Sequence, residues 1–180
     1  MMTLRCTRKL LDRLSLSGNM DAPGTLTPTP VLGDWYATIL FTRPSQLILA
    51  VNEKSRLCLL LPARELSTLA PRFCVEAAEL LQRIGVSEEA VEHEVQEMSP
   101  LTLASTRVLS ETGTSVSRSV LGSMNDFTRM VKFSLQRREW PLLDLSEQMC
   151  ETPCGPLQMR SPKEVARELL VAEATMRRGH

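Results

Sequence analysis

The segment from Arg118 to Asp126 contains the side chains best suited to hold a ligand. Its candidate ligand-binding residues are Arg118, Ser119, Asn125 and Asp126, which lie around an apolar stripe at the start of a predicted helix. The N–H groups of a first helical turn have no partner within the helix, so with a hydroxyl and a guanidinium they could hold an anion. The same residues could equally cap the helix and bridge to neighbouring turns, which is the commoner use of such side chains.

Asp34 and Trp35 are two further candidates for binding a ligand or a partner, at the start of a predicted strand. We expect one of the two rings Trp35 and Tyr36 to enter the core and the other to be partly exposed. We also expect Arg118 to face the turn that holds Asp34, because both segments are dense in polar groups that need partners once the apolar stripe is buried.

A basic run offers an alternative site, for nucleic acid. Its cations are Arg129, Lys132, Arg137 and Arg138, with no acid between residues 129 and 138. Asp34 and Asp126 are the carboxylates that would accompany them. Residues 86–100 carry five glutamates without a Lys or Arg. A solvated helix face is the more common meaning of either run.

Metal and nucleophile chemistry find little support in the sequence. Cys150 and Cys154 are four residues apart, but a zinc site needs four ligands, and the two histidines are His93 and His180. His93 stands between acids, which favour imidazolium, the wrong form for a general base. We therefore predict no metal, no cofactor and no catalytic residue.

The elements that must position these residues begin with three consecutive strands between Gly33 and Pro62, joined by short polar turns. This pattern predicts antiparallel hairpins. A short strand at 3–6 and a weak one at 101–109 extend the set. The predicted fold is α+β, an antiparallel meander of three to five strands whose one side is covered by about four to five helices.

Helical periodicity and capping signals predict helices near residues 8–14, 71–84, 87–98, 117–133, 144–149 and 163–176. Gly85 should end one of them. In the 117–133 helix, Val120, Met124, Phe127 and Val131 form the buried stripe, and Gly122 should mark close packing or a bend. We expect one domain over 1–135, with a loop at 15–30, and a C-terminal extension over 136–180 packed on it.

Three stretches together resemble a bacterial domain family of unknown function found in short stand-alone proteins. They are Leu4–Leu11, Leu32–Ala37 with Val51–Lys54, and Arg118–Phe127, so that the resemblance covers roughly residues 1–135. One departure is a longer loop between Thr106 and Arg118. The resemblance implies no established activity.

Composition narrows the class of protein. The chain has 180 residues, a formal charge of zero and five cysteines, and no apolar run of membrane-spanning length. These features predict a cytoplasmic protein without a disulfide framework, and they argue against one that coats nucleic acid or membrane. The favoured function is a non-enzymatic module that acts through a protein partner or in regulation. The alternative is a nucleic-acid-associated or toxin-antitoxin component that uses the basic run.

Overall fold

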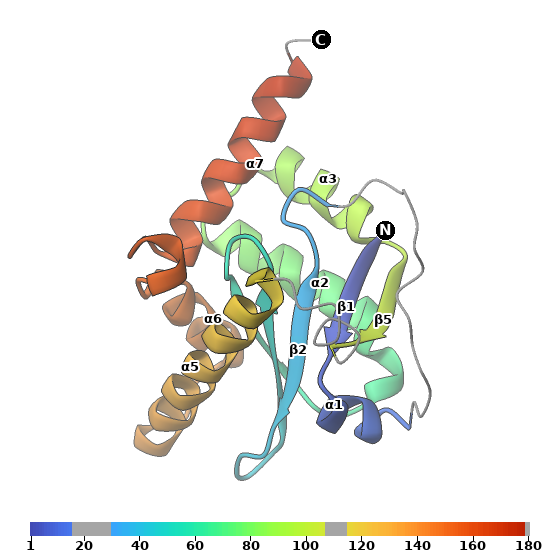
Figure 1. The fold of residues 1–180 in the computed structure, drawn as a ribbon, viewed down its shortest axis with the longest axis vertical. Coiled ribbons are helices and arrows are strands. Elements are labelled where there is room, and N and C mark those ends of the chain that lie inside the picture. The colour runs from blue at the N-terminus through green and yellow to red at the C-terminus, as the bar shows by residue number, and fades with distance from the viewer. Residues whose placement is uncertain (16–29, 107–114, 179–180) are drawn as a thin grey trace.

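The computed structural model describes residues 1–15, 30–106 and 115–178. Figure 1 shows a central sheet with helices around it and the last helix projecting away from the body. The described residues form six α-helices, which are α1 (Arg8–Arg13), α2 (Leu69–Arg83), α3 (Glu88–Met98), α5 (Ser115–Arg137), α6 (Leu142–Glu151) and α7 (Pro162–Arg178). Two 3-10 turns, Leu66–Thr68 and Gly155–Leu157, lie between them. No helix among these residues is both long and apolar enough to cross a membrane.

Five strands form one mixed sheet. They are β1 (Met2–Cys6), β2 (Trp35–Leu40), β3 (Leu47–Asn52), β4 (Cys58–Pro62) and β5 (Leu101–Ser105), in the spatial order β4-β3-β2-β1-β5. The predicted α+β class is confirmed, and β2, β3 and β4 are antiparallel as the short turns indicate. The purely antiparallel sheet is wrong, because β1 runs parallel to both β2 and β5. Residues 7–34 separate β1 from β2, a connection long enough for a crossover instead of a hairpin.

Helices cover both faces of the sheet, not one as the sequence suggested. Every residue of β3 is buried, and successive side chains of a strand point to opposite faces. In Figure 1, α5 lies in front of the sheet and α2 behind it. The ring of Phe73, on α2, meets that of Trp35 edge-on at 5.3 Å, while α5 contacts β2 and β3.

The apolar stripes place the helices as predicted. Val120, Met124, Phe127 and Val131 are all buried. Gly85 follows α2 with a φ of +85°, a conformation that suits a residue without a Cβ. α5 is longer than expected, ending at Arg137, because the chain reaches no helix breaker before Pro141.

One edge of the sheet is closed by α6, which lies along β4. The N–H of Leu60 donates to Oγ of Ser146 at 2.9 Å, and the N–H of Cys58 donates to Sγ of Cys150 at 3.3 Å. Since Ser146 and Cys150 are one helical turn apart, they meet alternate residues of the strand. The helix thus takes the place of a further strand and satisfies outward-facing groups of β4.

The segment before β2 is held by a buried carboxylate. Glu94, on α3, is 1% exposed, and its two oxygens accept the N–H groups of Val31 and Leu32 at 2.9 and 3.0 Å. The glutamate run is therefore not a uniformly solvated face. Burial raises the pKa of Glu94, and the two backbone donors act in the opposite direction.

Candidate functional site

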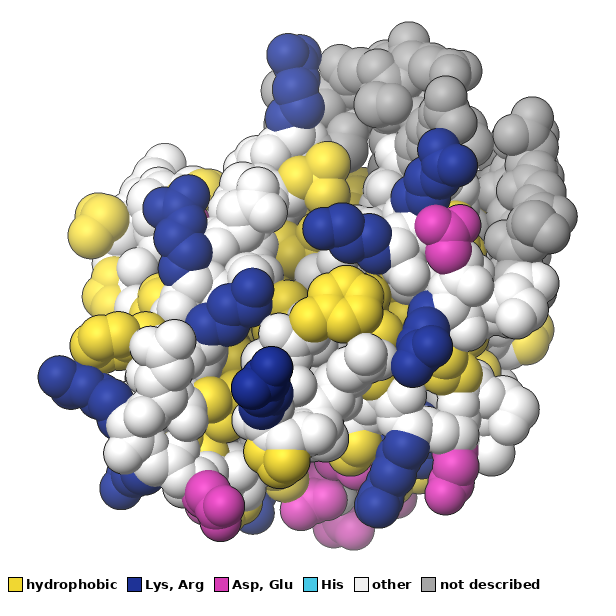
Figure 2. All heavy atoms as spheres, turned by 90° about the horizontal axis from the view of Figure 1, so that it is seen from below, with side chains coloured by type: hydrophobic (Ala, Val, Ile, Leu, Met, Phe, Trp, Pro, Cys, Tyr) yellow, Lys and Arg dark blue, Asp and Glu magenta, His cyan; other side chains and the backbone are white. Residues whose placement is uncertain are grey.

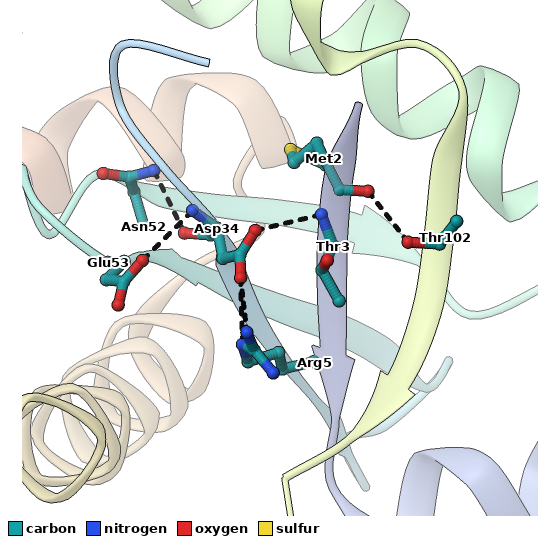
Figure 3. A network of polar contacts seen from close by, with 7 residues as sticks. All are labelled: Met2, Thr3, Arg5, Asp34, Asn52, Glu53 and Thr102. Carbon is teal, nitrogen blue, oxygen red and sulfur yellow. Dashed lines mark hydrogen bonds and ion pairs between the residues drawn. The ribbon is translucent and has the colours of Figure 1, made fainter. Parts of the chain in front are cut away.

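Asp34 lies at the centre of a polar network that joins β1, β2 and β3 (Figure 3). One carboxylate oxygen accepts the N–H of Thr3 at 3.0 Å, and the other accepts Nε and Nη2 of Arg5 at 3.0 and 2.7 Å. The N–H of Asp34 donates to the carboxylate of Glu53, and its carbonyl accepts the side-chain amide of Asn52 at 3.4 Å. Asp34 is thus engaged on all sides within the fold, which leaves it little capacity for a ligand.

Arg118 does not meet Asp34, contrary to the sequence prediction. The cation at Asp34 is Arg5, which reaches it from the neighbouring parallel strand that the antiparallel prediction had not placed there. Arg118 is exposed. The start of α5 does lie against the β3–β4 turn, through Arg56, whose Nη2 donates to Oγ of Ser119 at 3.1 Å.

Arg56 is a buried arginine that the sequence did not single out. It is 6% exposed and has a φ of +61°, and its Nε and Nη1 have no hydrogen-bond partner among the described residues. Burial lowers its pKa, while Glu53 acts in the opposite direction. These two atoms are fully buried, so no ligand can reach them in this conformation.

Both aromatic side chains at the start of β2 are buried, so the prediction of one exposed ring is wrong. Trp35 is 1% and Tyr36 is 2% exposed. Burial raises the pKa of Tyr36 to about 12, with the nearby Glu53 adding to the effect. Trp35 is therefore a core residue and is not available to a ligand.

The remaining residues of the predicted ligand segment do not converge with Asp34. Asn125 and Asp126 are exposed on α5, and Asp126 lies 3.8 Å from Arg129 of the next turn. Gly122 is neither closely packed nor a contact point, since an added Cβ would meet nothing within 4 Å. The apolar stripe is buried as predicted, but the polar residues around it are not gathered into one site.

A hollow of about 810 Å³ lies at the opposite end of the sheet, between the β2–β3 hairpin, the end of β4 and the α5–α6 connection. Its lining includes Trp140 and one acid, Glu139. The cations that line it are Arg13, Arg43, Arg64 and Arg138. We call it the first hollow.

A second hollow of about 480 Å³ adjoins the first. Its cations are Arg8, Lys9 and Lys132, and no acid lines it. Phe41 lines this hollow and the next residue, Thr42, lines the first. Along α5, Lys132 lines the second hollow and Leu135, one turn later, lines the first. The two hollows are therefore neighbours, and we call them together the basic face.

Most cations of the basic face have no carboxylate beside them. Five of them, Lys9, Arg43, Arg64, Lys132 and Arg138, make no ion pair or side-chain hydrogen bond with another described residue. Elsewhere, by contrast, cations such as Arg83, Arg160 and Lys163 lie beside carboxylates. Figure 2 views the molecule from this end and shows Lys and Arg side chains gathered around apolar patches, with few acids among them.

Arg137, the last residue of α5, and Arg138, which follows it, each lie over an aromatic ring. The guanidinium of Arg138 lies 3.6 Å from the centre of the Trp140 ring, and that of Arg137 lies 4.5 Å from the centre of Phe133. Only the first pair lines a hollow. Of the four residues predicted for nucleic acid, the structure thus places Lys132 and Arg138 on the basic face, and Arg129 and Arg137 outside its lining.

Burial raises the pKa of both cysteines of the C-terminal pair, Cys150 and Cys154. Cys150 is buried against β4, and burial raises its pKa to about 12, so the thiol stays protonated. Burial also raises the pKa of Cys154, while Arg56 acts in the opposite direction. Within the described ranges, no three His, Cys, Asp or Glu side chains come together to hold a metal ion.

Sequence reasoning missed several residues of the basic face, above all Arg13, Arg43, Arg64, Phe41 and Trp140. Each stands alone in its segment, and only the fold brings them together. One local signal was present, since Arg138 and Trp140 flank a single residue at a helix end, where an arginine can fold over a ring.

The chain belongs to the family described as Domain of unknown function (DUF6933), whose model matches residues 3–165. The match runs from β1 to the first residues of α7. No curated protein matches the chain, and no solved structure matches it.

Proposed function

We propose that this protein binds nucleic acid through the phosphate groups of the backbone, at the basic face. The observation that supports the proposal is the set of five cations gathered there that make no ion pair or side-chain hydrogen bond with another described residue. Arginine side chains suit phosphate because their N–H groups match its oxygens in pairs.

The shape of the basic face supports the same function. Its two hollows are open and adjoin along α5, so an extended chain of phosphates could pass through both. A formal net charge of zero does not oppose binding, because the local field depends on where the charges lie. The Arg138–Trp140 stack adds an ordered guanidinium in the first hollow.

A role in protein interaction or regulation, the favoured expectation from the sequence, stays a prediction, as do a bacterial origin and a cytoplasmic location. An open sheet edge would favour such a role, because a partner could add a strand to it. The β4 edge is not open, because Ser146 and Cys150 already bind its outward-facing N–H groups.

The test is an anisotropy titration with fluorescently labelled oligonucleotides at low salt. The double variant Arg43→Gln/Arg64→Gln removes two unpaired cations of the first hollow, and we expect it to lose affinity by about tenfold or more. The matched control is Arg160→Gln/Arg177→Gln, which removes the same charge from paired residues near or on α7. Equal losses in the two doubles, or no binding by the wild type, would refute the proposal.

A further inference from the structure

We infer that the nucleic acid bound at the basic face is single-stranded, with unpaired bases stacked on Phe41 and on the Arg138–Trp140 pair. This inference rests on the proposed function and names its substrate class. Phe41 is 58% exposed and lines the second hollow at the point where the first begins. An apolar ring held in water beside cations suits stacking against a base.

The Arg138–Trp140 pair forms a second stacking surface. Trp140 is half-buried and packs against the core, so its ring is held from below. The guanidinium of Arg138 lies 3.6 Å above that ring, and the residue is exposed. Its plane is therefore already oriented, with the outer surface free to stack on a base and the N–H groups free for phosphate.

The bases of a duplex could not stack on Phe41 or on the Arg138–Trp140 pair. In double-stranded nucleic acid the faces of the bases are covered by their neighbours, and a protein can reach only phosphates and base edges. The first hollow also presents Thr42, Ser45 and Gln46, which can hydrogen-bond the edges of splayed bases. Cations, aromatic surfaces and small polar groups together match the pattern of single-strand binding surfaces.

The chain offers a matched control for each of the two stacking groups. Phe133 is 56% exposed, close to the value for Phe41, but it does not line either hollow. Arg137 lies over a ring as Arg138 does, again outside both hollows. The informative variants are Phe41→Ala and Arg138→Lys, and their controls are Phe133→Ala and Arg137→Lys.

Three probes separate the inference from the function on which it rests. They are a labelled oligo(dT) of about 12 nucleotides, a hairpin duplex of similar length, and long-chain polyphosphate as a competitor that has phosphates without bases. We expect the single strand to bind at least tenfold more tightly than the duplex. Phe41→Ala and Arg138→Lys should each weaken single-strand binding by about 5- to 100-fold and leave competition by polyphosphate unchanged. The two controls should bind like the wild type.

Two outcomes would overturn the inference and leave the proposed function intact. One is equal affinity for the single strand and the duplex. The other is a loss that is the same in the variants and in their controls. If no probe binds, polyphosphate included, both the inference and the function fail. All four substitutions are at exposed side chains, so a circular dichroism spectrum like that of the wild type is expected for each.

Discussion

Asp34 and Arg138 carry opposite charges, and they differ in how many hydrogen-bond and ion-pair partners the fold gives them. Asp34 binds Thr3 and Arg5 through its carboxylate, and its backbone groups are bonded as well. Arg138 has a ring beneath it but makes no ion pair with another described residue. A charged group that has all its partners holds the structure together, whereas one without them is available to a ligand.

The ion pair between Arg5 and Asp34 should be energetically coupled. In a double-mutant cycle of Arg5→Ala with Asp34→Ala, measured by urea unfolding, we expect an interaction energy of about 1 to 3 kcal/mol. The physical reason is the pair of hydrogen bonds from Arg5 to one carboxylate oxygen of Asp34, between side chains that are only 17% and 12% exposed. The control is the cycle of Arg118→Ala with Asp34→Ala, whose effects should add. Coupling in the control cycle and none in the first would mean that Arg118, and not Arg5, pairs with Asp34.

Glu94 gives a prediction on pH dependence. Burial raises the pKa of Glu94 in the folded protein above its unfolded value of 4.5. A group with a raised folded pKa contributes stability below its unfolded pKa and loses that contribution as the pH rises through the folded pKa. The free energy of unfolding of the wild type, minus that of Glu94→Gln, should therefore fall between pH 4.5 and pH 7.5.

Urea unfolding at several pH values measures this difference, and Glu92→Gln serves as the control, because Glu92 is an exposed residue of the same helix. The fall over this range should be larger for Glu94→Gln than for the control, because Glu94 is the buried one of the two. A Glu94 difference that rises with pH would mean that the hydrogen bonds from Val31 and Leu32 outweigh the cost of burial.

At the scale of elements, local pattern predicted most of the helices and the central strands. The three strands β2, β3 and β4 follow from apolar runs joined by short turns, and α2 and α5 follow from apolar stripes of helical spacing. The direction of β1 could not be predicted this way, because pairing across a long connection depends on distant packing. The packing of α6 along the β4 edge could not be predicted either, because a single serine and a single cysteine form no recognisable sequence pattern.

The exposure of Phe41 shows a further limit of predicting burial from the sequence. The sequence places it in an apolar run that we read as a strand of the core, yet β2 ends at Leu40 and Phe41 is 58% exposed. A strand period assigns side chains to faces only while the strand continues. Positions at element ends are the least predictable, and this one lies on the basic face.

Gly122 in α5 provides a test of helix propensity. An added Cβ would meet no atom within 4 Å, and Gly122 lies well inside the helix on its exposed side. Gly122→Ala should therefore raise the free energy of unfolding by up to about 1 kcal/mol, through the higher helix propensity of alanine. Thermal or urea unfolding measures the change. A loss of stability would instead indicate the close packing that the sequence first suggested.

At the scale of the whole molecule, balanced charge conceals an uneven distribution. The chain has 21 basic and 21 acidic residues. Cations such as Arg83 on α2 and Arg177 on α7 lie beside carboxylates, while five of the seven cations that line the two hollows make no ion pair or side-chain hydrogen bond with another described residue. The residues of the basic face come from α1, the β2–β3 hairpin, the segment after β4 and the end of α5. Such a site cannot be predicted from any one segment, because it exists only once the fold has brought these segments together.

The salt dependence of binding should report the number of these cations that contact phosphate. If all five unpaired cations do so, the slope of log K against log salt concentration for a single strand should be about −3.5. Arg64→Gln removes one such contact, so its slope should be shallower by about 0.7. Arg177→Gln, which removes a cation paired with Glu173 on α7, should leave the slope unchanged. Anisotropy titrations over a series of salt concentrations give the slopes, and a wild-type slope near zero would mean that phosphate contacts do not drive the binding, whatever the affinity at low salt.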